Sequence, residues 1–282
     1  MQVYAFIDGS PIASAVCDVA AWTSLRLDVP LKMLHVLERS ESALAGDLSG
    51  SLGVDSREHL LDELVALDER RSRLALEHGQ HMLAEAERRA KEDGVEQVSS
   101  LQRHGSLVDT VAELEDDIRV IVIGRLGEGH ESSAHTIGSH LENVIRTSHR
   151  PILVAVPDFS VPTSFMIAYD GSATAEKALD MVIASPLLKG LECHLLTVCP
   201  EGDERLKQMA QAEEKLQGAG FAVRSQRLQG DVHSALQQYQ QQHNVGMLVM
   251  GAYGHSRIRQ FFVGSNTTRT VSLSDIPVLL LR

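Results

Sequence analysis

The stretch GAYGHSRIRQFFVGS (Gly251–Ser265) follows the apolar run MLVM (Met247–Met250) and leads into a segment that can form a helix. A glycine-rich turn between a buried strand and a helix N-terminus directs several backbone N–H groups toward one point, an arrangement that suits a phosphate group. Glycine also lets the backbone approach a ligand closely. The spacing alone is equally consistent with an ordinary strand-to-helix loop. The pattern in the rest of the chain distinguishes between these two interpretations.

The surrounding pattern occurs twice in the 282 residues. Internal repeats of this kind indicate duplicated structural units. Four segments recur in the same order: an apolar run ending in Asp-Gly-Ser, a second apolar run, a long glycine-led segment ending in an apolar run, and a final apolar run. We therefore predict a tandem duplication with a short linker near residues 157–163, where Pro157 and Pro162 lie.

Each half alternates five short apolar runs with four segments of helical spacing. Runs such as VIVIG (residues 120–124) are typical of strands buried on both faces. Alternation of this kind predicts an α/β fold: two Rossmann-like domains, each a five-stranded parallel sheet with helices on both faces. The predicted domains are residues 1–157 and 163–282.

The first half is longer than the second, mostly because of an insertion at about residues 39–74. A loop-like segment is followed there by a charged, amphipathic sequence that reads as one long helix or two joined helices. Two interpretations remain open. The segment is either a solvated helical lid or embellishment, or it is a helix that binds a partner or forms a flap over a ligand site.

Composition excludes several classes of protein. The net charge of -12 argues against general nucleic-acid binding, because phosphate backbones attract basic surfaces. No apolar run reaches the roughly 20 residues that span a bilayer. Cys17, Cys193 and Cys199 are too few and scattered for a disulfide framework, and they suggest buried thiols in a reducing compartment. We expect a cytoplasmic protein without membrane or nucleic-acid partners.

The repeat places the glycine loop at a predicted crevice. In an open parallel sheet, ligands bind beyond the carboxyl ends of the strands where the winding order reverses. In a five-stranded unit that point lies between the first and fourth strands. In the second half these strands end at Asp170 and Gly251, and Val198 ends the second strand. The crevice would suit a nucleotide, with phosphate at the glycine loop and with Asp170 accepting from a base amine or ribose hydroxyl.

These motifs together resemble the universal stress protein family, in its tandem two-domain form. The resemblance covers nearly the whole chain except the insertion. It implies a site for ATP or another adenine nucleotide, with or without Mg²⁺, and pairing of the two halves through their last strands; a homodimer of the whole chain is left open. The residues that it assigns to the nucleotide are Ala168, Asp170, Val198, Gly251, Gly254, His255, Gly264, Ser265 and Asn266.

The first half departs from this pattern. Ten residues, rather than nine, separate Gly127 from Gly138, and Glu128 and Glu131 place negative charge where phosphate would lie. One such repulsion at about 4 Å costs up to about 4 kcal/mol before screening. We expect the first half to bind nucleotide weakly or not at all, although Asp8 persists there.

The resemblance implies a stress-response regulator rather than an enzyme. The alternatives are a nucleotide-free interaction scaffold and, with less support, a slow ATP hydrolase. No catalytic residue is predicted, since Asp170 is already assigned to the base or ribose. No metal-binding site is predicted either, because the spacing of His130, His135 and His140 does not align them on one helix face.

Overall fold

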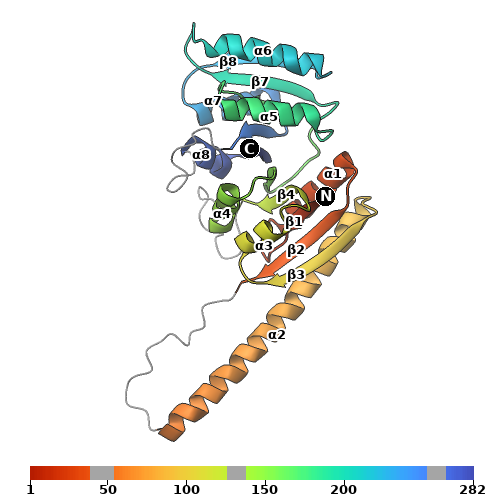
Figure 1. Ribbon diagram of the computed structural model, residues 1–282, viewed down its shortest axis with the longest axis vertical. Coiled ribbons are helices and arrows are strands. Elements are labelled where there is room, and N and C mark those ends of the chain that lie inside the picture. Colours follow the sequence, from red (N-terminus) through yellow and green to blue (C-terminus); the bar gives the residue numbers. More distant parts are fainter. Residues whose placement is uncertain (39–53, 126–137, 253–264) are drawn as a thin grey trace.

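The computed structural model describes residues 1–38, 54–125, 138–252 and 265–282. These residues form ten strands and eight helices that alternate along the chain, as predicted (Figure 1). Within the described residues, no helix is both long and apolar enough to cross a membrane.

The first half contains five parallel strands. They are β1 (Gln2–Phe6), β2 (Leu31–Leu37), β3 (Val98–His104), β4 (Ile118–Gly124) and β5 (Ile152–Ala155). The helices between them are α1 (Ala13–Leu27), α2 (Val54–Glu92), α3 (Leu107–Leu114) and α4 (Ser139–Thr147).

The second half repeats this order. Its strands are β6 (Ser164–Ala168), β7 (Glu192–Val198), β8 (Val223–Leu228), β9 (Leu248–Gly251) and β10 (Val278–Leu281). Its helices are α5 (Ala173–Ala184), α6 (Arg205–Gly218), α7 (Val232–His243) and α8 (Ser265–Leu273).

The two five-stranded sheets are joined into one mixed sheet of ten strands. Its order is β3-β2-β1-β4-β5-β10-β9-β6-β7-β8. Each half is parallel, and the halves meet where β5 and β10 pair antiparallel, with Leu279 opposite Leu153. The predicted pairing of the two halves through their last strands is therefore confirmed. The domain limits at 157 and 163 stay predictions, because strands of both halves belong to one continuous sheet.

Two hydrophobic cores, one on each face of the sheet, extend through both halves. One core contains buried residues of α1, α2, α5 and α6, and the other contains those of α3, α4, α7 and α8. Helices thus cover both faces of each half, as predicted. The seam is further held by Arg26 of α1, whose Nε donates to Leu187 O at 2.9 Å, and by Trp22, whose ring contacts Phe159 edge-on.

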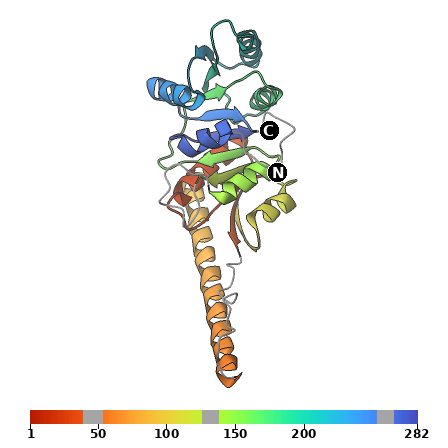
Figure 2. The same cartoon turned by 90° about the vertical axis from the view of Figure 1, so that its left-hand side faces the viewer.

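The insertion contains one long helix rather than two. Of the predicted segment, residues 39–53 lie outside the described part, and residues from Val54 onward belong to the 39-residue α2. Only its C-terminal part packs on the sheet and α1, through Leu83, Ala86 and Ala90. The N-terminal part extends away from the body in both views (Figures 1 and 2).

Candidate functional site

The carboxyl ends of β6, β7 and β9 meet at one edge of the second half. Strand β6, the first of this half, lies between β7 and β9, and Ala168 is in register with both Leu196 and Met250. The winding reverses between β6 and β9, which is the predicted position. Four of the assigned residues, Ala168, Asp170, Val198 and Gly251, lie at the ends of these strands.

Asp170 is exposed just beyond the end of β6. Its Oδ1 accepts a hydrogen bond from Ser172 N at 2.9 Å, and Ser172 Oγ in turn accepts from Ala175 N at 3.1 Å, capping α5. Gly171 between them has φ +73°, a conformation that L side chains rarely adopt. The carboxylate is therefore held at the N-terminus of α5.

Gly251 lies close against the first turn of α5. A Cβ atom at this position would be 3.0 Å from Thr174 Cγ2 and 3.2 Å from the Thr174 carbonyl carbon. Contacts at these distances are tighter than nine in ten of those that real Cβ atoms make. The glycine therefore allows the end of β9 to approach α5, the helix whose N-terminus lies next to Asp170.

Arginine side chains lie at the outer wall, at the end of β7. Arg205 Nη1 points to Val198 O at 3.4 Å, and Arg205 Nη2 pairs with Asp203 Oδ2 at 2.7 Å. This hydrogen bonding to Arg205 lowers the pKa of Asp203 to about 2. Arg227 Nη1 lies 3.4 Å from Cys199 O. The sequence analysis did not find these two cations, and the Asp203–Arg205 pair just before α6 was the only local signal for one of them.

The remaining assigned residues belong to the glycine loop and the helix after it. Gly254, His255 and Gly264 lie outside the described residues. Ser265 and Asn266 form the first turn of α8, of which the structure describes the backbone. One turn later, Arg269 Nη1 pairs with Asp231 Oδ2, at the N-cap of α7, at 3.0 Å. The described residues therefore place the end of β9 and the start of α8 on either side of residues 253–264.

The corresponding edge of the first half carries an additional acid. Asp8 persists there, and its Oδ1 accepts from Ser10 N at 3.1 Å. Glu38 directly follows β2, and its Oε1 lies 3.5 Å from Leu107 N, at the start of α3, and 3.3 Å from His140 Nδ1 in the first turn of α4. The repeat aligns Glu38 with Pro200, which has no charge. Glu128 and Glu131 lie outside the described residues.

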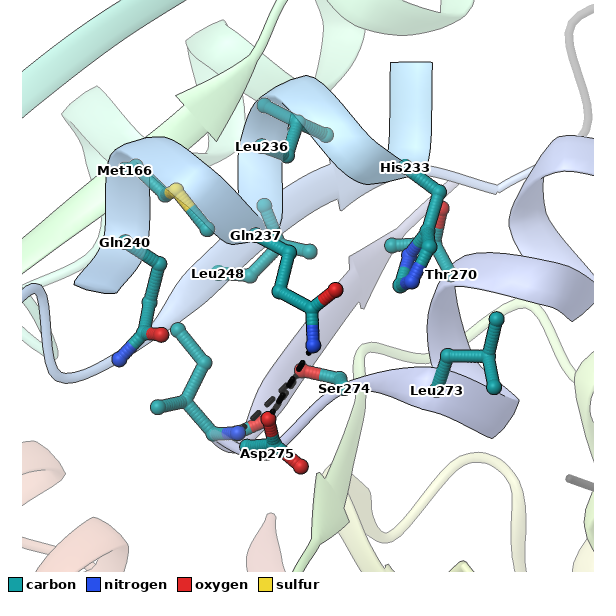
Figure 3. Close-up of a pocket in the computed structure, with 11 residues that line it drawn as sticks. Met166, His233, Leu236, Gln237, Gln240, Leu248, Thr270, Leu273, Ser274 and Asp275 are labelled. Atoms are coloured by element: carbon teal, nitrogen blue, oxygen red, sulfur yellow. Dashed lines mark hydrogen bonds between the residues drawn. The ribbon is translucent and has the colours of Figure 1, made fainter. Parts of the chain in front are cut away.

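Two cavities in the described residues lie away from this edge. One, of about 20 Å³, is lined by residues of α7, α8, β6 and β9, including His233 and Thr270 (Figure 3). Gln237 Nε2 reaches Asp275 Oδ2 there at 3.4 Å. This volume suits about one water molecule. The other, of about 120 Å³, lies at the seam between α5, β4 and β10.

The described residues hold no cluster of metal-binding side chains, and their three cysteines are buried. No group of three or more His, Cys, Asp or Glu side chains in the described ranges could hold a metal ion. Cys17, Cys193 and Cys199 are free and buried, as the sequence analysis expected. Burial raises the pKa of the Cys17 and Cys193 thiols to about 12, so both are protonated at neutral pH.

Comparisons with known proteins agree with the repeat. The model of the universal stress protein family matches residues 2–156 and 200–282. The universal stress protein Slr1230 of Synechocystis sp. (strain ATCC 27184 / PCC 6803 / Kazusa) is 34% identical over 279 residues, which cover 98% of this chain and 97% of that protein. A solved universal stress protein from Archaeoglobus fulgidus DSM 4304 is 19% identical, with a TM-score of 0.72 over 100% of this chain and 96% of its own. A solved universal stress protein in complex with cAMP covers 44% of this chain and 98% of its own, with 19% identity and a TM-score of 0.38.

Proposed function

Since the chain belongs to the universal stress protein family, we propose that it is a stress-response regulator that binds ATP or another adenine nucleotide in its second half. Members of the family can bind nucleotides. The choice of the second half rests on this chain's own residues.

The approach of Gly251 to Thr174 carries the proposal. It brings the start of the glycine loop against the helix whose N-terminus holds the Asp170 carboxylate. A nucleotide in this crevice would place its phosphates at the loop and at the N-terminus of α8, where backbone N–H groups and the helix dipole favour negative charge. Mg²⁺, where present, would be held by the phosphates.

The base and ribose would lie between β6 and β7. Asp170 uses Oδ1 for Ser172 N, and a carboxylate has acceptor capacity for a further amine or hydroxyl donor. The backbone at Ala168 and Val198 would contact the purine edge. Arg205, which lies at Val198 O, places positive charge on the same wall. The guanidinium would therefore have to shift, or be shared, when a base pairs with that carbonyl.

We propose that the first half has a structural role and does not bind nucleotide. Glu38 already places a carboxylate near the N-termini of α3 and α4, where a nucleotide would place phosphate. A second anion at this edge would be repelled. This observation favours the scaffold interpretation for residues 1–157. Residues 163–282 form the half that is proposed to bind nucleotide.

Binding is proposed to bias a conformation or an interface, rather than to feed a catalytic step. Efficient phosphoryl transfer needs a positioned base and metal-holding acids at the γ-phosphate. In this proposal Asp170 contacts the base or ribose instead. Turnover of ATP at about one per second or faster would support the enzyme alternative.

A matched pair of carboxylate variants tests the proposal by calorimetric titration of the nucleotide-free protein with ATP. Asp170→Asn removes the charge from a hydrogen bond of about 1.5–3 kcal/mol, so affinity should fall about 10- to 100-fold. Asp8→Asn makes the same change in the first half and should alter affinity less than about threefold. Equal losses would refute the asymmetry, and no binding by the wild-type protein would favour the scaffold.

The glycine loops provide a second pair. Gly264→Leu places a side chain where the proposed phosphate approaches the backbone, and it should abolish binding. Gly138→Leu makes the same change at the start of α4 and should leave ATP binding intact. Mass spectrometry of small molecules released from the denatured wild-type protein then identifies which nucleotide copurifies. A Gly264→Leu variant that binds ATP normally would contradict the proposed phosphate position.

A further inference from the structure

The cavity of about 120 Å³ at the seam between the two halves is lined mainly by apolar side chains. Nine of its eleven lining residues are apolar. They come from β4 and the residue before β5 in the first half, and from α5, the turn after it and β10 in the second half. This volume is far larger than one water molecule needs. Protein interiors contain few such voids, because atoms that line an empty space lose packing contacts.

Both halves hold the walls of this cavity in place. One wall is the sheet, where Val120 of β4 and Leu279 of β10 are buried. The other wall is the C-terminal part of α5 together with the turn after it, which contains Leu187. Arg26 of α1 fixes this turn, since its Nε donates to Leu187 O at 2.9 Å and its Nη2 donates to Lys189 O. The cavity is therefore preformed, and it lies between two structural units, where small-molecule sites often occur.

A single cation lines the cavity, on its partly exposed side. Arg119 of β4 and Ser185 after α5 are only partly buried, whereas Val182 and Leu281 are buried. Within the described residues, the Arg119 side chain has no hydrogen bond or ion pair. A ligand that enters from this side therefore meets a positive charge before it reaches the apolar interior. An unpaired guanidinium in this position favours a ligand with an anionic group.

We propose that this cavity binds a short-chain carboxylate, with the hydrocarbon chain among the apolar side chains and the carboxylate at Arg119. The volume sets the length of the chain. An apolar cavity of about 150 Å³ holds benzene, so a slightly smaller one suits a chain of about five carbons. The charge sets the head group, because one guanidinium balances one carboxylate and pairs with it through two hydrogen bonds. A phosphate monoester would bring about two negative charges at pH 7.

The cavity is separate from the candidate nucleotide site, although α5 contributes to both. The first turn of α5 lies beside Asp170 and Gly251, through Ser172 and Thr174. The part of α5 that lines the cavity begins at Met181, about two turns later. Carboxylate binding at the seam therefore does not depend on nucleotide binding at the strand ends, and Asp170→Asn should leave it unchanged.

Titration of the full-length protein with hexanoate tests the proposal, followed by NMR of ¹³C-labelled methionine methyl groups. Met181 lines the cavity, and its signal is assigned with the variant Met181→Leu. This signal should shift and saturate with a dissociation constant of about 1 mM or below. Butanoate should bind about 10-fold more weakly, because it buries two fewer CH₂ groups. A Met181 signal that does not respond to hexanoate would overturn the proposal.

Decanoate checks the size of the site. Its chain is longer than the cavity, so it should bind no more tightly than hexanoate. Affinity that keeps rising with every added CH₂ group up to decanoate would indicate adsorption to the protein surface, and would overturn the assignment to this cavity.

Two variants separate the charge from the apolar interior. Arg119→Met keeps an unbranched apolar side chain and removes the charge, so hexanoate should bind about 10-fold more weakly or worse, while the neutral hexan-1-ol binds as before. The control Arg71→Met removes an exposed arginine of α2 and should alter neither affinity. Equal losses for both ligands in Arg119→Met, or no loss for hexanoate, would refute the role of the charge.

Val182→Phe places a larger side chain in the cavity and should abolish binding of both ligands. Circular dichroism and the thermal midpoint verify that this variant is folded. A folded Val182→Phe protein that binds hexanoate with wild-type affinity would overturn the proposal. If the variant does not fold, the comparison of Arg119→Met with Arg71→Met, read at the Met181 signal, decides the result.

Discussion

Asp117 is the residue before β4, and its side chain is hydrogen-bonded to two residues of β1. Its Oδ2 accepts from the buried Tyr4 hydroxyl at 2.7 Å and from Gln2 Nε2 at 2.8 Å. The hydrogen bond from Tyr4 is the main cause that holds the pKa of Asp117 below its ordinary value of 3.8. The hydrogen bond from Gln2 lowers this pKa further, whereas burial of the carboxylate acts to raise it. The native state therefore favours the ionised carboxylate.

This lowered pKa gives a signed pH dependence. The stabilisation is present above the unfolded-state pKa, near 3.8, and is lost as the pH falls through the lower folded-state pKa. Tyr4→Phe should reduce the free energy of unfolding by about 1 kcal/mol at pH 7 and by less at pH 3, measured by urea denaturation. Asp116→Asn, which changes the neighbouring exposed carboxylate, should not alter this acid limb. A Tyr4→Phe effect that is equal at both pH values would contradict the assignment.

At the same scale, the sequence indicated those residues of the candidate site that belong to short local motifs. Asp170 and Gly251 stand in motifs that can be read within a few residues, and strand order then brought them together. Two other contacts depend on how the helices pack on the sheet. Arg205 lies at Val198 O, and Glu38 lies near Leu107 N. Spacing along the chain carries little information on such contacts, so these residues were found only in the structure.

Helix ends are joined across the seam in a reciprocal way. Arg125, just after β4, donates from Nη1 to Ser274 O at 2.7 Å, at the C-terminus of α8. Arg282, at the end of the chain, donates to Arg146 O at 3.1 Å and to Ser148 O at 2.9 Å, at the C-terminus of α4. A cation at a helix C-terminus interacts favourably with unpaired carbonyls and with the helix dipole.

Hydrogen exchange should resolve these two contacts by element. Arg125→Ala removes a half-buried, charge-assisted bond and should cost about 1.5–3 kcal/mol, with faster exchange in the last turn of α8. Arg282→Ala removes more exposed bonds and should speed exchange in the last turn of α4, with a smaller loss of stability. Exchange that rises equally at both helices in both variants would show general destabilisation instead of local capping.

Element order was predicted fully, but the form of α2 was not. Apolar runs bounded by glycine and proline indicate strands clearly, so all ten strands could be foreseen. The sequence of α2 allowed one helix or two, because amphipathic spacing continues through a bend as readily as through a straight helix. The structure has one helix, since residues from Leu83 to Ala90 fix its C-terminal part on the sheet while the preceding turns continue in the same direction.

The whole molecule should unfold as one unit. Both hydrophobic cores contain residues of both halves, so the halves share the apolar surface buried at β5 and β10. Leu279→Ala, at the antiparallel pair with Leu153, should cost about 2–5 kcal/mol and lower the midpoint of a single calorimetric transition. Two separate transitions, of which only one shifts, would show that residues 1–157 and 163–282 are independent folding units.

The antiparallel joint between β5 and β10 also fixes stoichiometry. Two separate subunits that met along such an edge would exchange partners and would part on dilution. Here one polypeptide supplies both, so the contact is intramolecular and independent of protein concentration. Each molecule then carries one copy of each edge, and mutations in one copy never enter the other. Glu38 and Pro200 at equivalent positions show that such divergence has occurred.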